Sequence, residues 1–367
     1  MKNYPCKKGT EVFMFRVKFF SVMASLLCFS LVLLFVSCAT APARPSPTVP
    51  VGPDWTRGGT HERFHDFLYL TAVGSGSSRH AAEMNAFGQL VAIFGMDIQV
   101  DERLRESYRE VMRSGAAATW THDTAIDRDV AIQAGMDGLI GAEIGDVWET
   151  RRSSYALAVM NRARAVQIYS EMIRANQEII DNLTNMPAEE RNSLDGFSRY
   201  QFAAVLADMN ISYGAVLSVI GSPQYAQGLR RGDDFRRGAQ EIATAIPISI
   251  SVSNDRAGRI QSAFAAAFSD LGFRTGGVNP RYVLDVDIVL LPTEHQGPNV
   301  FARMELTANL VETGTAAVLL PYTFNRREGH VVLSEAENRV FLYAERRISN
   351  DYRDMLSNYL SQLIPRQ

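Results

Sequence analysis

The chain has 367 residues, a formal net charge of −3, three cysteines and six histidines. Every lysine and every cysteine lies within the first 38 residues, which excludes lysine Schiff bases, a P-loop, internal disulfides and thiolate zinc sites from the rest of the chain. Residues 38–367 carry 32 arginines against 39 acidic side chains, a net charge of −7, and therefore lack the basic surface of a general nucleic-acid binder.

The first segment has the features of an export signal. Residues 14–37 begin with basic residues, continue as an apolar run from Phe19 to Val36 and end in small residues beside Cys38. The proline-rich sequence that follows contains no stop-transfer cluster of charges, so we predict a cleaved signal peptide over residues 1–37. Two alternatives stay open. One is an uncleaved signal anchor, because the apolar run approaches the length of a membrane span. The other is a translation start at Met14 rather than Met1.

The residues at the end of the signal predict a lipid anchor. Phe35-Val36-Ser37-Cys38 resembles the bacterial lipobox, in which the cysteine is lipidated and becomes the first residue of the mature protein, although Phe35 stands where leucine is usual. Acyl chains such as palmitate stabilise membrane binding by about 0.8 kcal/mol for each CH₂ group buried in the bilayer, and they anchor a protein without a transmembrane helix. We expect Ala39, which is not an aspartate, to direct the lipoprotein to the outer membrane. Five prolines in residues 39–60 predict an extended tether, so residues 38–60 comprise the lipidated Cys38 and its tether.

A first α+β unit is predicted over residues 61–161. Phe67–Val73 is strand-like and leads into Gly74 and a glycine-serine turn. Apolar residues at helical spacing from Ser78 to Phe94, stopped by Gly95, predict a helix. The order β-α-β-β-β predicts an antiparallel sheet with one face covered by the helix. The three further strands are expected at Met96–Val100, within Asp129–Trp148 and at Ser154–Met160.

Two long helices follow. Apolar stripes over Arg162–Leu183 and Leu194–Ile220 predict a helical hairpin that spans residues 162–222. The stripes could dock a partner helix, but packing within the hairpin is the simpler use. The polar, arginine-rich residues 223–240 are expected to form a linker between domains.

A second α+β unit is predicted over residues 241–367. Alternation over Ile248–Val252 indicates a strand, and the stripe from Ile260 to Leu271 indicates a helix closed by Gly272. A long final helix begins at Ser334, with Ser334 and Glu337 as a capping box. The whole body is therefore α+β, and this unit has the order β-α-β-β-β-α. Its other strands are expected at Tyr282–Leu291, Met304–Val311 and Ala316–Phe324.

Part of the first unit resembles a known family. The run Tyr69–Gly76, the alanine-rich helix after it, Met96–Val100, Val147-Trp148 and Tyr155–Arg162 are similar to the twenty-kilodalton outer-membrane lipoprotein family (Lpp-twenty-like) of bacteria, over about residues 62–165. The resemblance implies a small α+β layer on an envelope lipoprotein, in some members linked to flagella or surface antigens. It implies no catalytic residues. The carboxy-terminal unit is similar to periplasmic lipoproteins that activate peptidoglycan synthases or assemble envelope machinery.

One motif suggests an enzyme. His61-Glu62-Arg63-Phe64-His65 spells H-E-x-x-H, which on a helix places two imidazoles for zinc and the glutamate as general base. Glu83 is a candidate third ligand. The motif follows the tether and precedes a strand, and Arg63 is charged where zinc proteases have an uncharged residue. An exposed turn is therefore the preferred interpretation.

Four other patterns have a simpler structural explanation. Gly74-Ser75-Gly76-Ser77-Ser78 could hold an anion at a helix start, but it fits a tight turn with a serine cap. Arg231-Gly232-Asp233 is an integrin-type tripeptide within a charged segment. Asp285 and Asp287 share a strand face that could bind a cation and that we expect to be solvated. Arginine pairs could meet acidic glycans or lipid headgroups, although interspersed acids favour a solvated surface. These pairs are Arg151-Arg152, Arg230-Arg231, Arg236-Arg237 and Arg346-Arg347.

The sequence thus predicts a non-enzymatic, lipid-anchored envelope protein that binds or scaffolds other envelope components, with no cofactor and no nucleic acid. The expected partners are the membrane, through Cys38, and envelope proteins or peptidoglycan; a homo-oligomer stays open. Two alternatives remain. One is a zinc-dependent hydrolase using His61, Glu62 and His65, and the other is an assembly factor for flagellar or peptidoglycan machinery.

Overall fold

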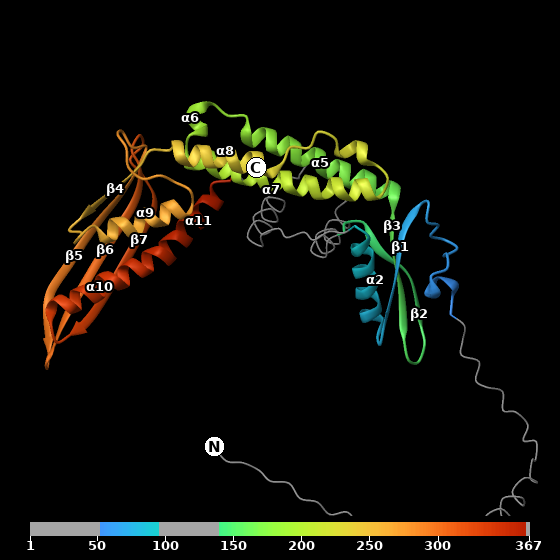
Figure 1. Cartoon of the computed structure of the whole chain (residues 1–367), viewed down its shortest axis with the longest axis horizontal. Helices are drawn as coiled ribbons and strands as arrows, with labels where there is room; N and C mark the ends of the chain where they lie inside the picture. Colours follow the sequence, from blue (N-terminus) through green and yellow to red (C-terminus); the bar gives the residue numbers. More distant parts are fainter. Residues whose placement is uncertain (1–51, 95–138, 365–367) are drawn as a thin grey trace, which may run out of the picture. The chain divides into compact units, whose positions relative to one another are not determined.

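The first sheet is antiparallel. The computed structural model describes residues 52–94 and 139–364, and within them three strands pair in the order β1-β3-β2 (Figure 1). The strands predicted before Gly74 and after Ser154 are confirmed. Met96–Val100 and the first part of Asp129–Trp148 lie outside the described residues. The bounds are β1 (Tyr69–Gly76), β2 (Ala142–Glu149) and β3 (Ser154–Asn161).

Helix α2 (Arg79–Ile93) covers one face of this sheet. Its buried stripe consists of Ala82, Ala86 and Leu90, which pack in one core with small and aliphatic side chains of the strands. Ser78 caps the helix, since its Oγ accepts the N–H of Ala81 at 3.2 Å. The predicted arrangement of an antiparallel sheet with a covering helix is confirmed.

The opposite face of the sheet receives the residues that follow the tether. A 3₁₀ turn, η1 (Asp54–Arg57), buries Trp55 so that it is only 3% exposed. Trp55 and Phe64 pack on Leu157 and Val159 of β3. The tether that was predicted to run to residue 60 therefore ends earlier, because one tryptophan gives the segment enough apolar surface to bury.

The predicted helical hairpin is present. It consists of α5 (Arg162–Thr184) and α7 (Leu194–Val219), with a short helix α6 (Ala188–Arg191) before α7. Side chains cap both long helices: Asn161 Oδ1 accepts the N–H of Arg164 at 3.0 Å, and Ser193 Oγ accepts that of Gly196 at 3.0 Å.

Helix α7 is apolar on almost every side. Among the described residues it is the one helix long and apolar enough to cross a membrane, and most of it is buried inside the protein. Its first turn belongs to the core of the second sheet, its middle packs with α5 and α8, and its last turns belong to the core of the first sheet. Burial by several neighbours accounts for the apolar composition of a core helix.

Residues 223–240 do not form the predicted linker. They contain a 3₁₀ turn, η3 (Pro223–Ala226), and most of a helix, α8 (Gly232–Ala245), which packs on α7. The buried stripe of α8 includes Phe235, Ala239 and Ile242. The surrounding charges conceal this stripe in the sequence, because only a few of the fourteen residues of α8 are apolar and large.

The second sheet has the strand order β4-β5-β6-β7. β4 and β5 are parallel and joined through α9, and the remaining pairs are antiparallel, so the predicted order β-α-β-β-β-α is confirmed. Helices α9, α10 and α11 lie against one face (Figure 1). The last three strands are longer than predicted. The bounds are β4 (Ile248–Ser253), α9 (Arg259–Asp270), β5 (Tyr282–Gln296), β6 (Asn299–Glu312), β7 (Ala317–His330), α10 (Leu333–Arg347) and α11 (Arg353–Gln362).

The final helix differs from the prediction in two ways. A π-helical turn, η4 (Ile348–Tyr352), separates α10 from α11. The capping box is wrong, because α10 begins at Leu333, one residue before Ser334, and its N-cap residue Val332 provides no side-chain hydrogen bond. Glu337 instead forms an ion pair with Arg256, which precedes α9.

Candidate functional site

The H-E-x-x-H residues form irregular turns rather than a helix. His61 is 12% exposed at its side chain, and its Nε2 lies 3.1 Å from Asp146 Oδ2 on β2. Its Nδ1 accepts the N–H of Arg63 at 3.0 Å. Because Nδ1 acts as an acceptor, the ring proton is on Nε2, which donates to Asp146.

The described residues do not have the geometry that the zinc-hydrolase alternative requires, in which His61, His65 and a third ligand meet at one point. His65 stacks on Phe67, with ring centroids 5.9 Å apart, and Glu83 forms an ion pair with Arg79 at 2.7 Å. Within the described ranges 52–94 and 139–364, no three His, Cys, Asp or Glu side chains come together as a metal site. The helix that would align His61 and His65 does not form, because the segment is held to the sheet by its aromatic residues.

An aromatic cluster holds this segment in place. The ring of His61 lies between those of Trp55, at 6.3 Å, and Phe64, at 4.8 Å, and Phe64 meets Tyr69 edge-on at 5.1 Å. The guanidinium of Arg63 lies 5.1 Å from the centre of the Phe64 ring. These contacts attach the end of the tether to the first sheet. We call residues 53–66 with Asp146 the docking segment.

The predicted tight turn at Gly74 is wrong, because Gly74, Ser75 and Gly76 belong to β1 and pair with β3, and packing explains the glycine. A Cβ on Gly74 would lie 2.1 Å from the backbone nitrogen of Ala86 and 2.3 Å from the carbonyl oxygen of Ala82. Glycine is therefore required for α2 to lie directly on β1. The predicted serine cap is confirmed at Ser78.

The Arg-Gly-Asp tripeptide lies at the start of α8. A Cβ on Gly232 would lie 2.2 Å from Asp208 Oδ1, so the glycine allows α8 to approach α7. Arg236 bridges the two helices through Asp208 at 2.6 Å and Asp233 at 2.7 Å, and its guanidinium lowers the pKa of Asp233. The tripeptide thus has a packing role.

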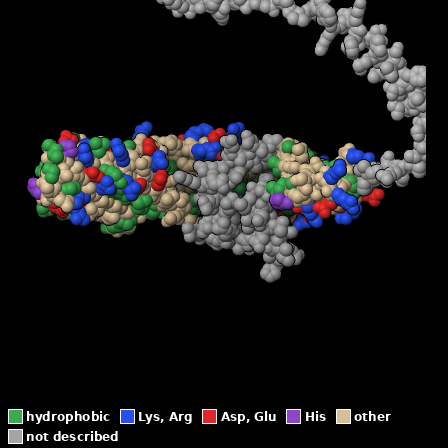
Figure 2. All heavy atoms as spheres, turned by 90° about the horizontal axis from the view of Figure 1, so that it is seen from below, with side chains coloured by type: hydrophobic (Ala, Val, Ile, Leu, Met, Phe, Trp, Pro, Cys, Tyr) green, Lys and Arg blue, Asp and Glu red, His purple; other side chains and the backbone are tan. Residues whose placement is uncertain are grey.

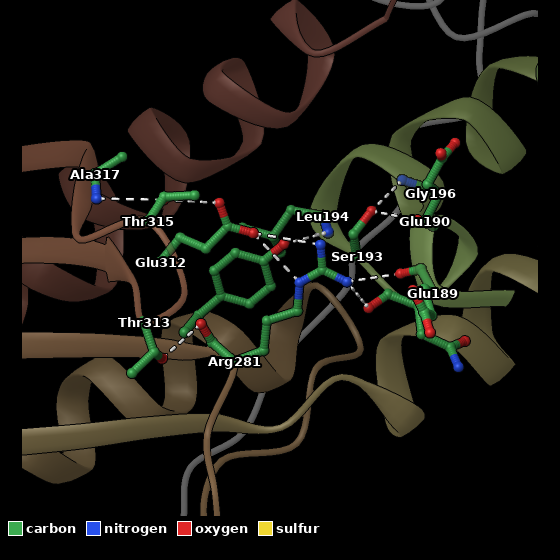
Figure 3. Close-up of polar contacts among 12 residues, drawn as sticks. Glu189, Glu190, Ser193, Leu194, Gly196, Arg281, Glu312, Thr313, Thr315 and Ala317 are labelled. Carbon is green, nitrogen blue, oxygen red and sulfur yellow. Dashed lines mark hydrogen bonds and ion pairs between the residues drawn. The ribbon is translucent and has the colours of Figure 1, made fainter. Parts of the chain in front are cut away.

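A polar cluster joins the hairpin to the second sheet (Figure 3). Arg281, at the start of β5, donates from Nη1 to the carbonyl oxygens of Glu189 at 2.7 Å and Asn192 at 3.0 Å. Its Nε and Nη2 lie 3.3 Å from Glu312 Oε1 on β6. The N–H of Leu194 donates to the Tyr282 hydroxyl at 3.3 Å. We call Arg281, Glu312 and these partners the Arg281 joint.

The remaining charged patterns are surface features. Asp285 and Asp287 are exposed on the face of β5 opposite its buried aliphatic residues, as predicted. Figure 2 shows basic and acidic side chains interspersed over the described surface in that view. Arg230, Arg236, Arg237 and Arg347 form ion pairs with aspartates. Cys38, the predicted lipidation site, lies outside the described residues.

Sequence reasoning missed the residues that position these clusters. The burial of Trp55 could have been predicted, because a large apolar side chain in an otherwise polar, proline-rich segment has no local residues to pack against and is expected to pack on the body of the protein. The roles of Asp146 and Arg281 left no such signal, since their partners are 85 and up to 92 residues away along the chain.

Comparisons with known proteins place the chain in no family. No family model matches it, and no curated protein matches it. The secreted protein HP1454 from Helicobacter pylori is 12% identical, with a TM-score of 0.36, over 76% of this chain and 97% of that one. A minor lipoprotein from Acinetobacter baumannii is 15% identical, with a TM-score of 0.23, over 32% of this chain and 91% of that one. The PelC dodecamer from Paraburkholderia phytofirmans is 17% identical, with a TM-score of 0.20, over 33% of this chain and 88% of that one.

TM-scores of this size do not establish a shared fold. HP1454 is described as a secreted protein and the Acinetobacter baumannii protein as a lipoprotein, and neither similarity shows membership of the twenty-kilodalton lipoprotein family. The resemblance to that family stays a prediction.

Proposed function

We propose that this chain is a lipid-anchored protein of the bacterial envelope, held at the outer membrane through Cys38, that binds or scaffolds other envelope components. The observation that carries the proposal is the division of the sequence at Cys38. Every lysine and cysteine precedes residue 39, an apolar leader ends there, and a proline-rich tether begins. The leader would be discarded and the mature chain would start at its single cysteine.

The described residues support a binding role over a catalytic one. Three of the motifs with catalytic or ligand-binding potential take part in packing: His61 in the docking segment, Gly74 under α2 and Gly232 under α8. The aromatic contacts of Trp55 and Phe64 attach the tether to the body. We further propose the predicted domain division 61–161, 162–222 and 241–367 with one change: α8 (Gly232–Ala245) belongs with the helical hairpin on which it packs, so the third domain begins at residue 246.

The anchor is tested by replacing one cysteine at a time. Cys38→Ser should abolish incorporation of radiolabelled palmitate and leave the unprocessed precursor, because the acylated thiol is missing. Cys28→Ser is the matched control, since Cys28 lies in the same apolar leader and should leave labelling intact.

Two results would contradict the proposal. If Cys38→Ser retains the acyl label, the anchor is elsewhere. If the unsubstituted chain takes up no label and keeps the mass of the full leader in the membrane fraction, the protein is held by an uncleaved signal anchor.

A further inference from the structure

The turn between β2 and β3 exposes two adjacent arginines. Arg151 and Arg152 are both exposed, and neither guanidinium has a hydrogen bond or ion pair with another described residue. Thr150 builds the turn: its Oγ1 accepts the N–H groups of Arg152 at 3.2 Å and Ser153 at 3.0 Å, and its own N–H donates to Ser153 O at 2.8 Å. Four residues, Thr150 to Ser153, separate the paired Glu149 and Ser154, and none of the four has a positive φ, so the turn holds two arginines without backbone strain and leaves both side chains exposed.

Two aromatic residues lie directly beside this turn. Trp148 and Tyr155 are cross-strand partners, with ring centroids 5.4 Å apart, and both are partly exposed. They lie on the face of the sheet that also carries Trp55 and Phe64 of the docking segment. Tryptophan and tyrosine side chains with partly solvent-exposed rings are enriched where proteins contact the headgroup region of a membrane.

The charge at this end of the sheet is positive. Arg151 and Arg152 are joined there by the Arg79–Glu83 pair at the start of α2 and by Glu149, whose carboxylate accepts the Ser154 hydroxyl at 3.4 Å. Three arginines therefore face two glutamates, a net charge of +1 among these described residues, although the mature chain as a whole is acidic. The attraction for an anionic partner comes from the two guanidinium groups without a described ion pair, Arg151 and Arg152, and not from the net charge.

The length of the tether limits how far this surface could lie from a bilayer that holds Cys38. Residues 39–52 separate Cys38 from the docking segment, and these fourteen residues reach at most about 50 Å when fully extended. The segment then docks on the same sheet face as Trp148 and Tyr155. A chain anchored at Cys38 would thus keep the β2–β3 turn within reach of the lipid headgroups.

We propose that Arg151, Arg152, Trp148 and Tyr155 form a second membrane contact, which binds the anionic phospholipid headgroups of the bilayer that holds the lipid of Cys38. The proposal rests on the proposed anchor. Guanidinium groups bind phosphate oxygens in a bidentate manner, the aromatic rings lie at the headgroup level, and an acyl chain combined with a basic patch gives a more stable attachment than either alone.

Flotation of the unlipidated chain with lipid vesicles tests this contact. Residues 39–367 contain every buried core residue and lack both the leader and the acyl group. This chain should bind vesicles of phosphatidylcholine and phosphatidylglycerol in a salt-sensitive manner and bind pure phosphatidylcholine weakly. The double variant R151Q/R152Q should bind the anionic vesicles about 30-fold more weakly, from about 1 kcal/mol per arginine near an anionic surface.

The matched control is R274Q/R346Q. Arg274 and Arg346 are also exposed arginines without an ion pair to a described residue, so this variant has the same net charge and should bind within about twofold of the unsubstituted chain. The proposal is overturned if both double variants lose binding equally, if the unsubstituted chain ignores anionic vesicles, or if the β2–β3 arginines affect binding only to the soluble anionic glycan heparin. None of these results depends on acylation, so they are distinguishable from a failed anchor at Cys38.

Discussion

Two buried tyrosines have opposite hydrogen-bonding states. The Tyr169 hydroxyl accepts the N–H of Ile140 at 2.8 Å, whereas the Tyr352 hydroxyl, enclosed by Phe264, Phe268 and Tyr322, has no hydrogen-bond partner among the described residues. Burial raises the pKa of both, because the ionised form would lose its hydration. An unpartnered buried hydroxyl costs free energy, and a partnered one does not.

Replacement of each tyrosine by phenylalanine should therefore shift stability in opposite directions. Tyr352→Phe should raise the free energy of unfolding by about 1 kcal/mol, and Tyr169→Phe should lower it by about 1–2 kcal/mol because the Ile140 N–H is left unpaired. Urea denaturation at constant m-value measures both. A loss in Tyr352→Phe as large as in Tyr169→Phe would show that the Tyr352 hydroxyl has a partner after all.

At the scale of elements, helices α2 and α8 approach their neighbours closely only because glycines lie at the points of contact, and the sequence alone does not reveal this role. The glycine-serine run at Gly74 suggested an anion site at a turn, yet Gly74 lies within β1, and two backbone atoms of α2 within 2.3 Å of a Cβ show that it is a contact between α2 and β1. The prediction of a linker at residues 223–240 was wrong because it, too, overlooked a close contact that depends on glycines. Gly232 and Gly238 let α8 approach α7, where Asp208 and Tyr200 would meet any larger side chain.

Two glycines near the same helix should respond differently to alanine. Gly74→Ala should lower the free energy of unfolding by more than about 3 kcal/mol, because the clash is with backbone and α2 must move. Gly88→Ala, inside α2, meets nothing within 4 Å and should raise it by up to about 1 kcal/mol, the difference in helix propensity. Thermal and urea denaturation followed by circular dichroism would show this. Equal effects of the two substitutions would mean that α2 is not seated on β1 as described.

At the scale of the whole molecule, α7 and the Arg281 joint connect elements that are far apart in sequence. Apolar residues of α7 take part in three of the hydrophobic cores of the described residues. Inside the hairpin, the buried Asn176 Nδ2 donates to Asn210 Oδ1 at 2.9 Å, which favours one register of α5 on α7. The Arg281 joint then ties the α6–α7 corner to β5 and β6.

Loss of the Arg281 guanidinium should lower the local stability of the α6–α7 connection. Arg281→Ala removes the bonds to Glu189 O, Asn192 O and Glu312, and it should speed amide exchange at Leu194 about tenfold, equivalent to about 1–2 kcal/mol of local stability. Arg281→Lys keeps the charge without the planar fork and should give an intermediate rate. Hydrogen exchange measured by mass spectrometry should show no change in α2, and an equal acceleration there would mean that the substitution destabilises the whole chain.

The sequence alone determined the features that depend on local order. Periodicity predicted α2, α5, α7, α9 and all the strands that the structure describes, because the spacing of buried residues is a property of each segment. Composition likewise placed the export leader, the tether and the candidate anchor at Cys38 in one short stretch, although that part of the chain lies outside the described residues.

Only the tertiary structure decided what the ambiguous residues do. His61 is part of the docking segment because Asp146, 85 residues away, accepts a hydrogen bond from its ring and because Trp55 and Phe64 hold the turn on β3. Arg151 and Arg152 stand out as candidates for headgroup binding because both lack an ion pair with a described residue and lie beside Trp148 and Tyr155, whereas Arg230, Arg236 and Arg237 are paired with aspartates. Such partners are far apart in the sequence. A periodic pattern of apolar residues in one segment carries no information about which distant side chain will contact it in the folded protein.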